Sequence, residues 1–477
     1  MSPDHTSRSA RVPSATAERG PAVRPPAPPA SPAPAATPAS PASPGRMLGA
    51  ALLGFFLITL DASVVNVALP AMGDDLHGGL SALQWVVDGY TLAFAALMLS
   101  TGALSDRIGA GRAFGGGVLV FALSSLACGL APGLTVLIVA RVVQGTAAAV
   151  MLPSSLALVR QAYADPVRRT RAISVWATGG STAVALGPVV GGVLTTAWDW
   201  RSIFYVNLPF AVVTLALARG ARGERRPAPL DVPGQVTAVL ALSALTFAVI
   251  EGGTGGWIAA GVAVAAGAAF VVAETRHPHP VVPLGLFRGA AFSASVASGA
   301  ALSVGFFGMF FVLGLYFQQV RGESALTAGL MFLPMTLLIS TVNVLSGRVT
   351  NRFGPRLPMV VGQLVMAAGL LALLPVGRHT PTLAVAFLMV PLGVGGALAV
   401  PALTASVMGA VPAERAGLAA GVLNAARQVA GALSVALFGS LVAGAHFMPG
   451  LRESLLVAAG LVLAAAAATA VALRPRD

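Results

Sequence analysis

The sequence predicts an all-α, polytopic membrane protein with fourteen transmembrane helices, arranged as two pseudo-symmetric six-helix bundles with two helices inserted between them. Of the 477 residues, 56% are hydrophobic and only 10% are charged, whereas an ordinary soluble domain carries about 25% charged residues. Long apolar segments recur along the whole chain, and arginines gather in alternate loops between them. Lipid must therefore be the solvent for most of the apolar surface.

The apolar segments have the length of about 20 residues that a helix needs to cross a bilayer. They are residues 47–71, 82–104, 113–131, 134–158, 172–196, 202–218, 233–251, 256–273, 291–317, 325–347, 357–375, 382–405, 416–443 and 454–473. The chain is predicted to begin with a disordered cytoplasmic tail at residues 1–46 and an N-terminal six-helix bundle at 47–218. There follow a linker with two extra helices at 219–290, a C-terminal six-helix bundle at 291–473 and a short cytoplasmic tail at 474–477. The first tail is rich in Pro, Ala and Ser and cannot bury enough surface to fold.

Arginine placement predicts the orientation of the chain. All 29 basic residues are arginine, and with a cytoplasmic N-terminus 23 of them fall in inner loops and tails. The outer loops hold only Arg201, Arg321, Arg378 and Arg452. This bias follows the positive-inside rule and predicts a multi-pass protein of the bacterial cytoplasmic membrane with both termini in the cytoplasm. The arginines lie singly or in small groups between apolar runs, so membrane topology explains them better than a nucleic-acid partner.

A carboxylate in the first predicted helix is the leading candidate for carrying protons. The run from Leu60 to Pro70 contains Asp61 and Asn66, and Asp61 lies about 14 Å from the outer end at Pro70, at 1.5 Å per residue. A charged side chain inside a bilayer costs about 2.5–3.5 kcal/mol on insertion scales, so it should face a cavity or a partner. The alternative is a structural hydrogen bond between helices.

An arginine at a depth similar to that of Asp61 is a candidate partner for a buried acid. Arg141 and Gln144 are three residues apart in the segment 134–158, so they share one helix face. Arg141 lies about 10 Å from the outer end, so we expect it to set the proton affinity of an acid there, with structural pairing as the alternative. Asp88 lies at a similar depth in segment 82–104. It could pair with Arg141, form a second proton site, or lie at the outer rim near Trp85.

Two short loops rich in glycine and arginine occupy equivalent places in the two predicted bundles. Residues 102–112 contain Gly102, Asp106, Arg107, Gly109 and Arg112, and residues 347–356 carry Asn351 where the first loop has Asp106. Internal repeats of this kind are typical of secondary transporters. Asp106 and Arg107 are expected to pair with neighbouring helix ends, and a plain solvated turn is the alternative.

Glycines in the outer half of segment 172–196 predict a close helix contact. Gly187 and Gly191 are four residues apart, Pro188 removes a backbone donor, and Gly192 adds a further small residue. Small residues at this spacing let another helix approach closely, and the proline should bend the helix. We expect a contact that seals the outer side, with ordinary tight packing as the alternative.

Polar residues in the C-terminal segments are candidates to line a cavity. Arg427 should lie about 18 Å from the cytoplasmic end of segment 416–443, close to the membrane midplane. Asn424 lies on the same face of that helix. Cavity function and structural pairing remain equal alternatives for Arg427. The full set of cavity candidates comprises Asn66, Gln144, Gln318, Gln319, Asn424 and Arg427.

Together these motifs, with the stretch from Trp198 to Pro209, resemble the EmrB/QacA-type, fourteen-helix drug:proton antiporters of the major facilitator superfamily, over about residues 47–473. The resemblance implies cytoplasmic gating by the loop 102–112 and proton coupling by Arg141. It also implies an antiporter motif at residues 187–192, which importers of the superfamily usually lack.

The sequence therefore predicts a secondary transporter that exports lipophilic drug-like molecules in exchange for protons by alternating access. It has no His-Glu-x-x-His or Gly-x-Ser-x-Gly motif, and without lysine it has no Walker-type phosphate loop. We therefore expect no enzyme activity, no cofactor and no metal site. The expected partners are a small-molecule cargo, protons and the lipid bilayer, and the need for an adaptor protein is left open. The alternatives are a proton-coupled uptake symporter and a non-transporting membrane sensor.

Overall fold

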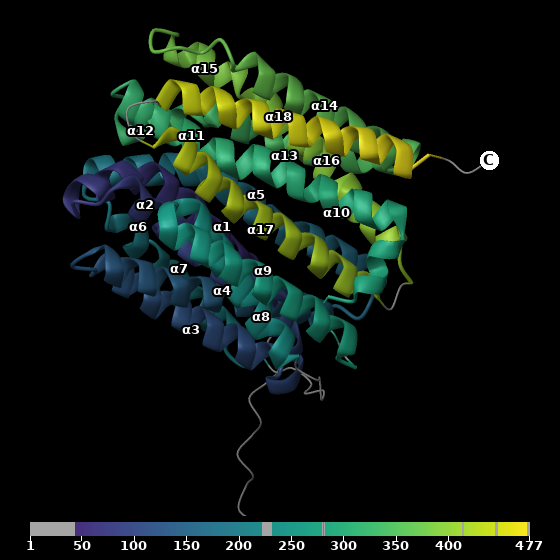
Figure 1. Ribbon diagram of the computed structural model, residues 1–477. Helices are drawn as coiled ribbons and strands as arrows, with labels where there is room; N and C mark the ends of the chain where they lie inside the picture. Colours follow the sequence, from purple (N-terminus) through teal and green to yellow (C-terminus); the bar gives the residue numbers. More distant parts are fainter. Residues whose placement is uncertain are drawn as a thin grey trace, which may run out of the picture. The chain divides into compact units, whose positions relative to one another are not determined.

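A computed structural model of the chain describes residues 43–221, 231–278, 280, 282–412, 415–443 and 447–474. Every regular element in these ranges is helical (Figure 1). The elements before residue 219 are α1 (Pro44–Asp75), α2 (Leu80–Ile108), α3 (Ala110–Gly129), α4 (Leu134–Ala162), α5 (Pro166–Ala197), α6 (Ser202–Tyr205) and α7 (Asn207–Ala218). Helix α1 begins three residues ahead of the predicted segment, and the rest of the predicted N-terminal tail lies outside the described residues.

The middle of the chain forms the predicted helix pair, α8 (Val232–Glu251) and α9 (Gly253–Arg276), followed by the short helix η1 (Leu284–Arg288). The remaining elements are α10 (Ala290–Ser303), η2 (Val304–Gly308), α11 (Met309–Leu315), η3 (Tyr316–Val320), α12 (Ala325–Met331), α13 (Leu333–Phe353), α14 (Arg356–Ala372), α15 (Thr382–Leu388), α16 (Val390–Gly409), α17 (Ala416–Val442) and α18 (Phe447–Ala472).

Each predicted apolar segment coincides with helix. In the described ranges, eleven helices are long and apolar enough to cross a membrane, or twelve if the bent pair α12 and α13 forms one span. The other two predicted segments fall on the shorter apolar helices at Ser202–Ala218 and Arg356–Ala372. The architecture is thus that of an all-helical membrane protein with eleven to twelve spans that meet this length criterion.

Helix α1 packs tightly on α5 because glycines of α5 face it. A Cβ atom added at Gly191 would lie 2.8 Å from the carbonyl oxygen of Val64, and one added at Gly187 would overlap the Ser63 side chain. Both glycines are buried, and α5 continues unbroken through Pro188. The prediction that Gly187 and Gly191 allow a close helix approach is therefore confirmed, with α1 as the partner.

Polar bonds at both of its ends attach the α8–α9 pair to α2. Gln235 of α8 donates to the carbonyl of Ala96 at 2.5 Å and accepts a hydrogen bond from Ser100. At the other end, Ser81 donates to Glu251 at 2.8 Å. Helix α8 also contacts α17, and Figure 1 shows the pair beside α17. The inserted helices thus lie against the contact between α2 and α17.

Helices of the N-terminal and C-terminal halves contact each other near the turn that joins α1 to α2. Gln84 of α2 donates to the carbonyls of Val435 and Ala436 in α17, at 3.2 and 2.7 Å. Gln318 donates to the carbonyl of Val67 in α1 at 3.0 Å. A Cβ atom at Gly192 of α5 would lie 2.6 Å from the Ala325 carbonyl oxygen of α12. These contacts close the end of the bundle opposite the loop at Gly109.

Candidate functional site

Asp61 lies at the centre of a buried polar network. Its side chain is fully buried, and Oδ2 accepts a hydrogen bond and an ion pair from Nη1 of Arg141. The other oxygen, Oδ1, accepts hydrogen bonds from the side-chain amides of Gln144 and Asn207, each at 2.8 Å. Three donors from two other helices, α4 and α7, thus converge on one carboxylate of α1. The ionised form of Asp61 is therefore well satisfied in this conformation.

Arg141 is held in place by more than its partner acid. Its Nε donates to the carbonyl of Val86 at 3.0 Å, and Nη1 also donates to Oε1 of Gln144 at 2.8 Å. The guanidinium carbon lies 4.2 Å from the ring centroid of Tyr90, a cation–π distance. Tyr90 in turn donates from its hydroxyl to the carbonyl of Ile58 at 3.1 Å. The positive charge is therefore fixed where α1, α2 and α4 meet.

The local sequence explains why α2 and α4 come close enough for this network. Gly145 follows Gln144, and a Cβ atom at this position would overlap the backbone carbonyl of Tyr90. Glycine is thus the residue that lets the two backbones touch. Cys128 and Ser125 of α3 complete the surroundings, since Ser125 accepts from Asn207 at 3.0 Å and Cys128 lies 3.7 Å from Oε1 of Gln144.

A rise of 1.5 Å per residue predicts a similar depth for Asp61 and Arg141, and the structure brings their side chains into direct contact. Asn207 was not among the predicted site residues, although it bonds the same carboxylate as Gln144. The available signal was an amide in an otherwise apolar segment, within the stretch from Trp198 to Pro209. Its place in the network depends on where α7 crosses α1, which spacing along the chain does not reveal.

Asp88 is buried without a partner. It is fully inaccessible, and neither carboxylate oxygen has a hydrogen bond to a residue that the structure describes. Asp88 therefore does not pair with Arg141 in this conformation. Asp88 follows Gln84 by one helical turn, and Gln84 contacts α17. This spacing places Asp88 on the α17 side of α2.

The predicted gating loop joins α2 to α3 at Gly109, which is buried and has a φ of 91°. Glycine adopts this backbone conformation without steric strain. Asp106, Arg107 and Arg112 are all exposed, and the structure shows no ion pair between any of them and a described residue. The expected charge pairing is absent in this conformation, in which the loop has the form of a solvated turn.

The remaining cavity candidates do not join the Asp61 network. Asn66 donates to the carbonyl of Ala62 in its own helix at 3.0 Å, and Gln318 bonds the backbone of α1 as described above. Gln319 and Asn424 are exposed, and Arg427 is partly exposed. Among the described residues, no group of three or more His, Cys, Asp or Glu side chains is placed to hold a metal ion.

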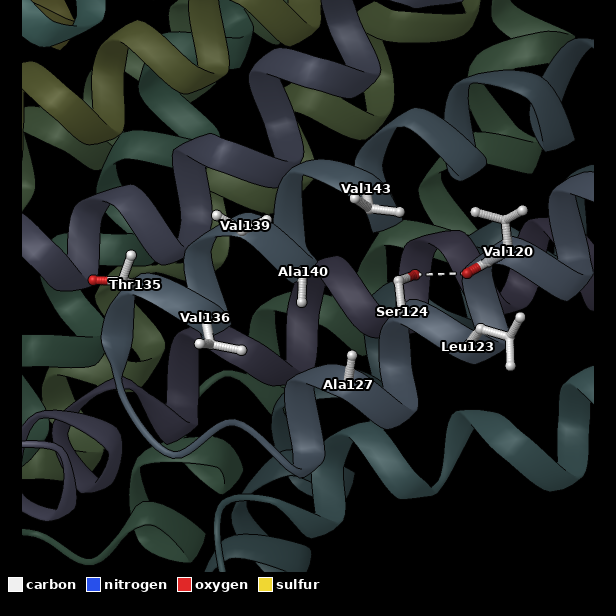
Figure 2. A pocket seen from close by; sticks show the side chains of 9 residues that line it. All are labelled: Val120, Leu123, Ser124, Ala127, Thr135, Val136, Val139, Ala140 and Val143. Atoms are coloured by element: carbon white, nitrogen blue, oxygen red, sulfur yellow. Dashed lines mark hydrogen bonds between the residues drawn. The ribbon is translucent and has the colours of Figure 1, made fainter.

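An apolar groove of about 570 Å³ lies between α3 and α4 (Figure 2). None of the residues that line it forms a hydrogen bond with the side chain of Asp61 or Arg141. Valine, leucine and alanine side chains dominate it, among them Val120 and Val139. Ser124 lines it too, but its hydroxyl already donates to the carbonyl of Val120 at 2.8 Å. The groove contains no charged residue and has the composition of a lipid-facing surface.

Proteins of similar sequence are resistance and export proteins. The family model described as Major Facilitator Superfamily matches residues 51–435. The chain is 38% identical over 403 residues to the methylenomycin A resistance protein of Streptomyces coelicolor, covering 83% of this chain and 85% of that protein. It is 38% identical over 403 residues to the multidrug resistance protein Stp of Mycobacterium tuberculosis, covering 82% and 74%. It is 35% identical over 406 residues to the tetracenomycin C resistance and export protein of Streptomyces glaucescens, covering 83% and 75%.

Solved structures of similar fold are more distant in sequence. A crystal structure of a D-xylose-proton symporter superposes with a TM-score of 0.66 at 17% identity, covering 89% of this chain and 97% of that one. A POT family transporter in complex with 5-aminolevulinic acid superposes with a TM-score of 0.70 at 14% identity, covering 90% and 96%. At these identities the likeness establishes the fold alone.

Proposed function

Because this chain belongs to the Major Facilitator Superfamily, we propose that it exports lipophilic drug-like molecules from a bacterial cytoplasm in exchange for protons. The chain is a transporter rather than an enzyme, and relatives at 35–38% identity bear the names of multidrug and antibiotic resistance proteins. The family and these names support drug efflux. Proton exchange is our own step, and it rests on the buried ion pair of Asp61 and Arg141.

Asp61 is the proposed proton carrier. A proton on this carboxylate would remove its charge and weaken the ion pair with Arg141, while the amides of Gln144 and Asn207 would lose an ionised acceptor. Loss of the proton restores all three bonds. The ion pair with Arg141 therefore forms only with the deprotonated carboxylate. The outer end of the bundle is closed in this conformation, so a released proton would leave toward the cytoplasm.

Asp88 is the proposed second proton site. An ionised carboxylate buried without a donor is costly, so Asp88 should hold a proton in this conformation. Helix α2 packs on α17, and separation of these helices would admit water and allow the proton to leave. We expect Asp88→Asn to retain efflux but to move fewer protons per cargo molecule, as measured by pH-dye fluorescence in liposomes.

Alternating access is the proposed mechanism. The contacts of Gln84, Gly192 and Gln318 close one end of the bundle, which positive-inside topology assigns to the outside. Rocking of the two six-helix bundles, 47–218 and 291–473, would break these contacts and close the end near Gly109 instead. Within residues 187–192, Gly192 faces α12 of the other bundle and would then act as the moving contact, with the loop 102–112 as part of the inner gate.

The topology that we propose has fourteen spans, as in EmrB/QacA-type transporters, with both termini in the cytoplasm. Two observations support it: each predicted apolar segment lies on helix, and the α8–α9 pair is bonded to α2 rather than separate from the bundle. The two shorter helices, Ser202–Ala218 and Arg356–Ala372, would cross with flanking residues at the interface.

Replacing Asn207 by alanine is expected to weaken the network that holds the Asp61 carboxylate. The change removes one hydrogen bond to the carboxylate, and such a bond to a charged group is worth about 1.5–3 kcal/mol. Proton-driven efflux should therefore fall at least about tenfold. Efflux of N-phenyl-1-naphthylamine from energised cells measures the loss. Asn351→Ala, at an exposed position, is the control and should leave efflux unchanged.

Transport in inverted membrane vesicles tests the proposed function. We expect vesicles that contain the protein to accumulate N-phenyl-1-naphthylamine, a neutral lipophilic dye, when their lumen is made acidic. A protonophore should abolish the accumulation. Dye that instead leaves the acidic lumen would indicate an uptake symporter. Accumulation that needs ATP but no proton gradient would refute proton exchange, and no movement under any gradient would favour a non-transporting sensor.

A further inference from the structure

Arg427 is an isolated charge in the C-terminal half of the protein. Among the six predicted spans between residues 291 and 473, it is the single Asp, Glu, His, Lys or Arg. The membrane interior of this half therefore contains a cation and no acidic residue to neutralise it. Such a charge inside a membrane is costly and usually marks a pathway or a binding site.

The guanidinium of Arg427 lacks partners in the described structure. Its Nε is buried with no hydrogen bond, and no ion pair joins the side chain to any described residue. Arg141 is a useful comparison, because the same kind of side chain there binds a carboxylate, an amide and a backbone carbonyl. The buried Arg141 is thus well bonded, and Arg427 lacks comparable bonds.

The helix around Arg427 adjoins open space. Residues 424–430 are all partly or fully exposed, whereas most residues from 431 to 439 are buried. Seven consecutive residues point in every direction around a helix, so at least one side of α17 is open at this level. The opposite direction is filled, because Cγ of Arg427 lies 3.1 Å from the point where a Cβ on Gly299 of α10 would be. The surface of α17 is therefore accessible beside the cation, near the predicted membrane midplane.

The residues beside Arg427 suit an amphipathic anion. Asn424 lies one turn earlier on the same face, and its exposed amide can donate a further hydrogen bond. Ala425 and Ala426 supply small apolar surface next to the charge. A guanidinium offers two parallel N–H donors that match the oxygen atoms of a carboxylate or similar oxyanion. Helix α17 also contacts α2 of the other half, and secondary transporters bind cargo at such an interface.

We propose that Arg427 recognises a negatively charged group on the cargo, so that the preferred substrates are lipophilic organic anions with a carboxylate or sulfonate. The inference rests on the proposed export function and specifies its substrate class. The anionic group binds the guanidinium, Asn424 adds a hydrogen bond, and the lipophilic body of the cargo lies in the space beside α17.

A matched pair of dyes tests the proposal. The anion 8-anilino-1-naphthalenesulfonate has the skeleton of neutral N-phenyl-1-naphthylamine with an added sulfonate. Transport of each dye is measured in liposomes with the membrane potential clamped at zero by potassium and valinomycin. For Arg427→Gln, the apparent KM for the sulfonate should rise at least about tenfold, the effect of losing charge-assisted hydrogen bonds. The KM for the neutral dye should change less than about twofold.

Controls separate charge recognition from misfolding and from failure of export itself. Arg452→Gln, at an exposed position of the same half, should change neither KM. If Arg427→Gln does not fold, Arg427→Lys tests the proposal instead. Lysine keeps the positive charge but lacks the planar pair of N–H donors, so Arg427→Lys should raise the KM for the sulfonate alone. Equal changes for both dyes, or none, would overturn the proposal. Wild-type protein that carries the neutral dye but not the sulfonate would overturn it while leaving export intact, and protein that carries neither dye would refute export itself.

Discussion

Asp61→Asn is expected to reduce proton-driven efflux to the level of vesicles without the protein, while the variant still inserts in the membrane. Asparagine keeps the size of the side chain and can still accept hydrogen bonds, but it cannot bind and release a proton. It also leaves Arg141 without its counter-charge, and breaking a buried ion pair costs about 3–5 kcal/mol. Efflux of N-phenyl-1-naphthylamine from energised cells measures the loss.

The matched control for this change is Asp74→Asn. Asp74 lies on the same helix α1 but is exposed, so its replacement should leave efflux within about twofold of wild type. Exchange of dye for dye across liposomes should persist in Asp61→Asn, which would demonstrate that the variant is folded and still binds cargo. Full efflux by Asp61→Asn would remove this carboxylate from the mechanism.

Gly192→Leu is expected to open the contact between α5 and α12 and to lower efflux below about a tenth of wild type. The first added atom would lie 2.6 Å from the Ala325 carbonyl oxygen and 2.8 Å from Cα of Leu326, so backbone atoms must move. Overpacking of this kind costs about 1–3 kcal/mol. That energy shifts a two-state equilibrium by roughly 5- to 150-fold. The conformation closed at this end should therefore lose population.

Two measurements follow the effect of Gly192→Leu. Spin labels at the outer ends of α5 and α12 should report a longer mean distance than in wild type, and dye efflux reports transport. Gly116→Leu is the control, since Gly116 is exposed on α3 and an added Cβ meets no atom within 4 Å. Wild-type distances and efflux in Gly192→Leu would mean that this contact does not move during transport.

The helices and the similar depth of Asp61 and Arg141 were predictable from the sequence because both depend on local patterns. The length of the apolar runs predicts the membrane-spanning segments, and a rise of 1.5 Å per residue predicts that Asp61 and Arg141 lie at a similar depth in the membrane. The breaks within two segments had a local signal too: α13 and α16 each begin just before a proline, at Pro334 and Pro391. Proline lacks the N–H that would continue the preceding helix.

Contacts between distant helices were not predictable from the sequence. Gly192 faces α12 and Gly191 faces α1, although the two glycines are adjacent, because one residue turns a helix by about 100°. Asn207 joins Asp61 only through the crossing of α7 over α1. The isolation of Asp88 was also hidden, because an acid at that depth was equally compatible with a bond to Arg141. Each of these depends on packing that no spacing along the chain encodes.

Cargo and protons are expected to exchange through Asp61. Liposomes that contain the purified protein, a pH-sensitive dye in the lumen and an outward gradient of N-phenyl-1-naphthylamine test it directly, with no initial proton gradient. Protons should enter as the dye leaves, and Asp61→Asn should exchange dye for dye without moving protons. Dye movement by the wild type with no proton entering, or equal proton fluxes in the wild type and Asp61→Asn, would contradict it.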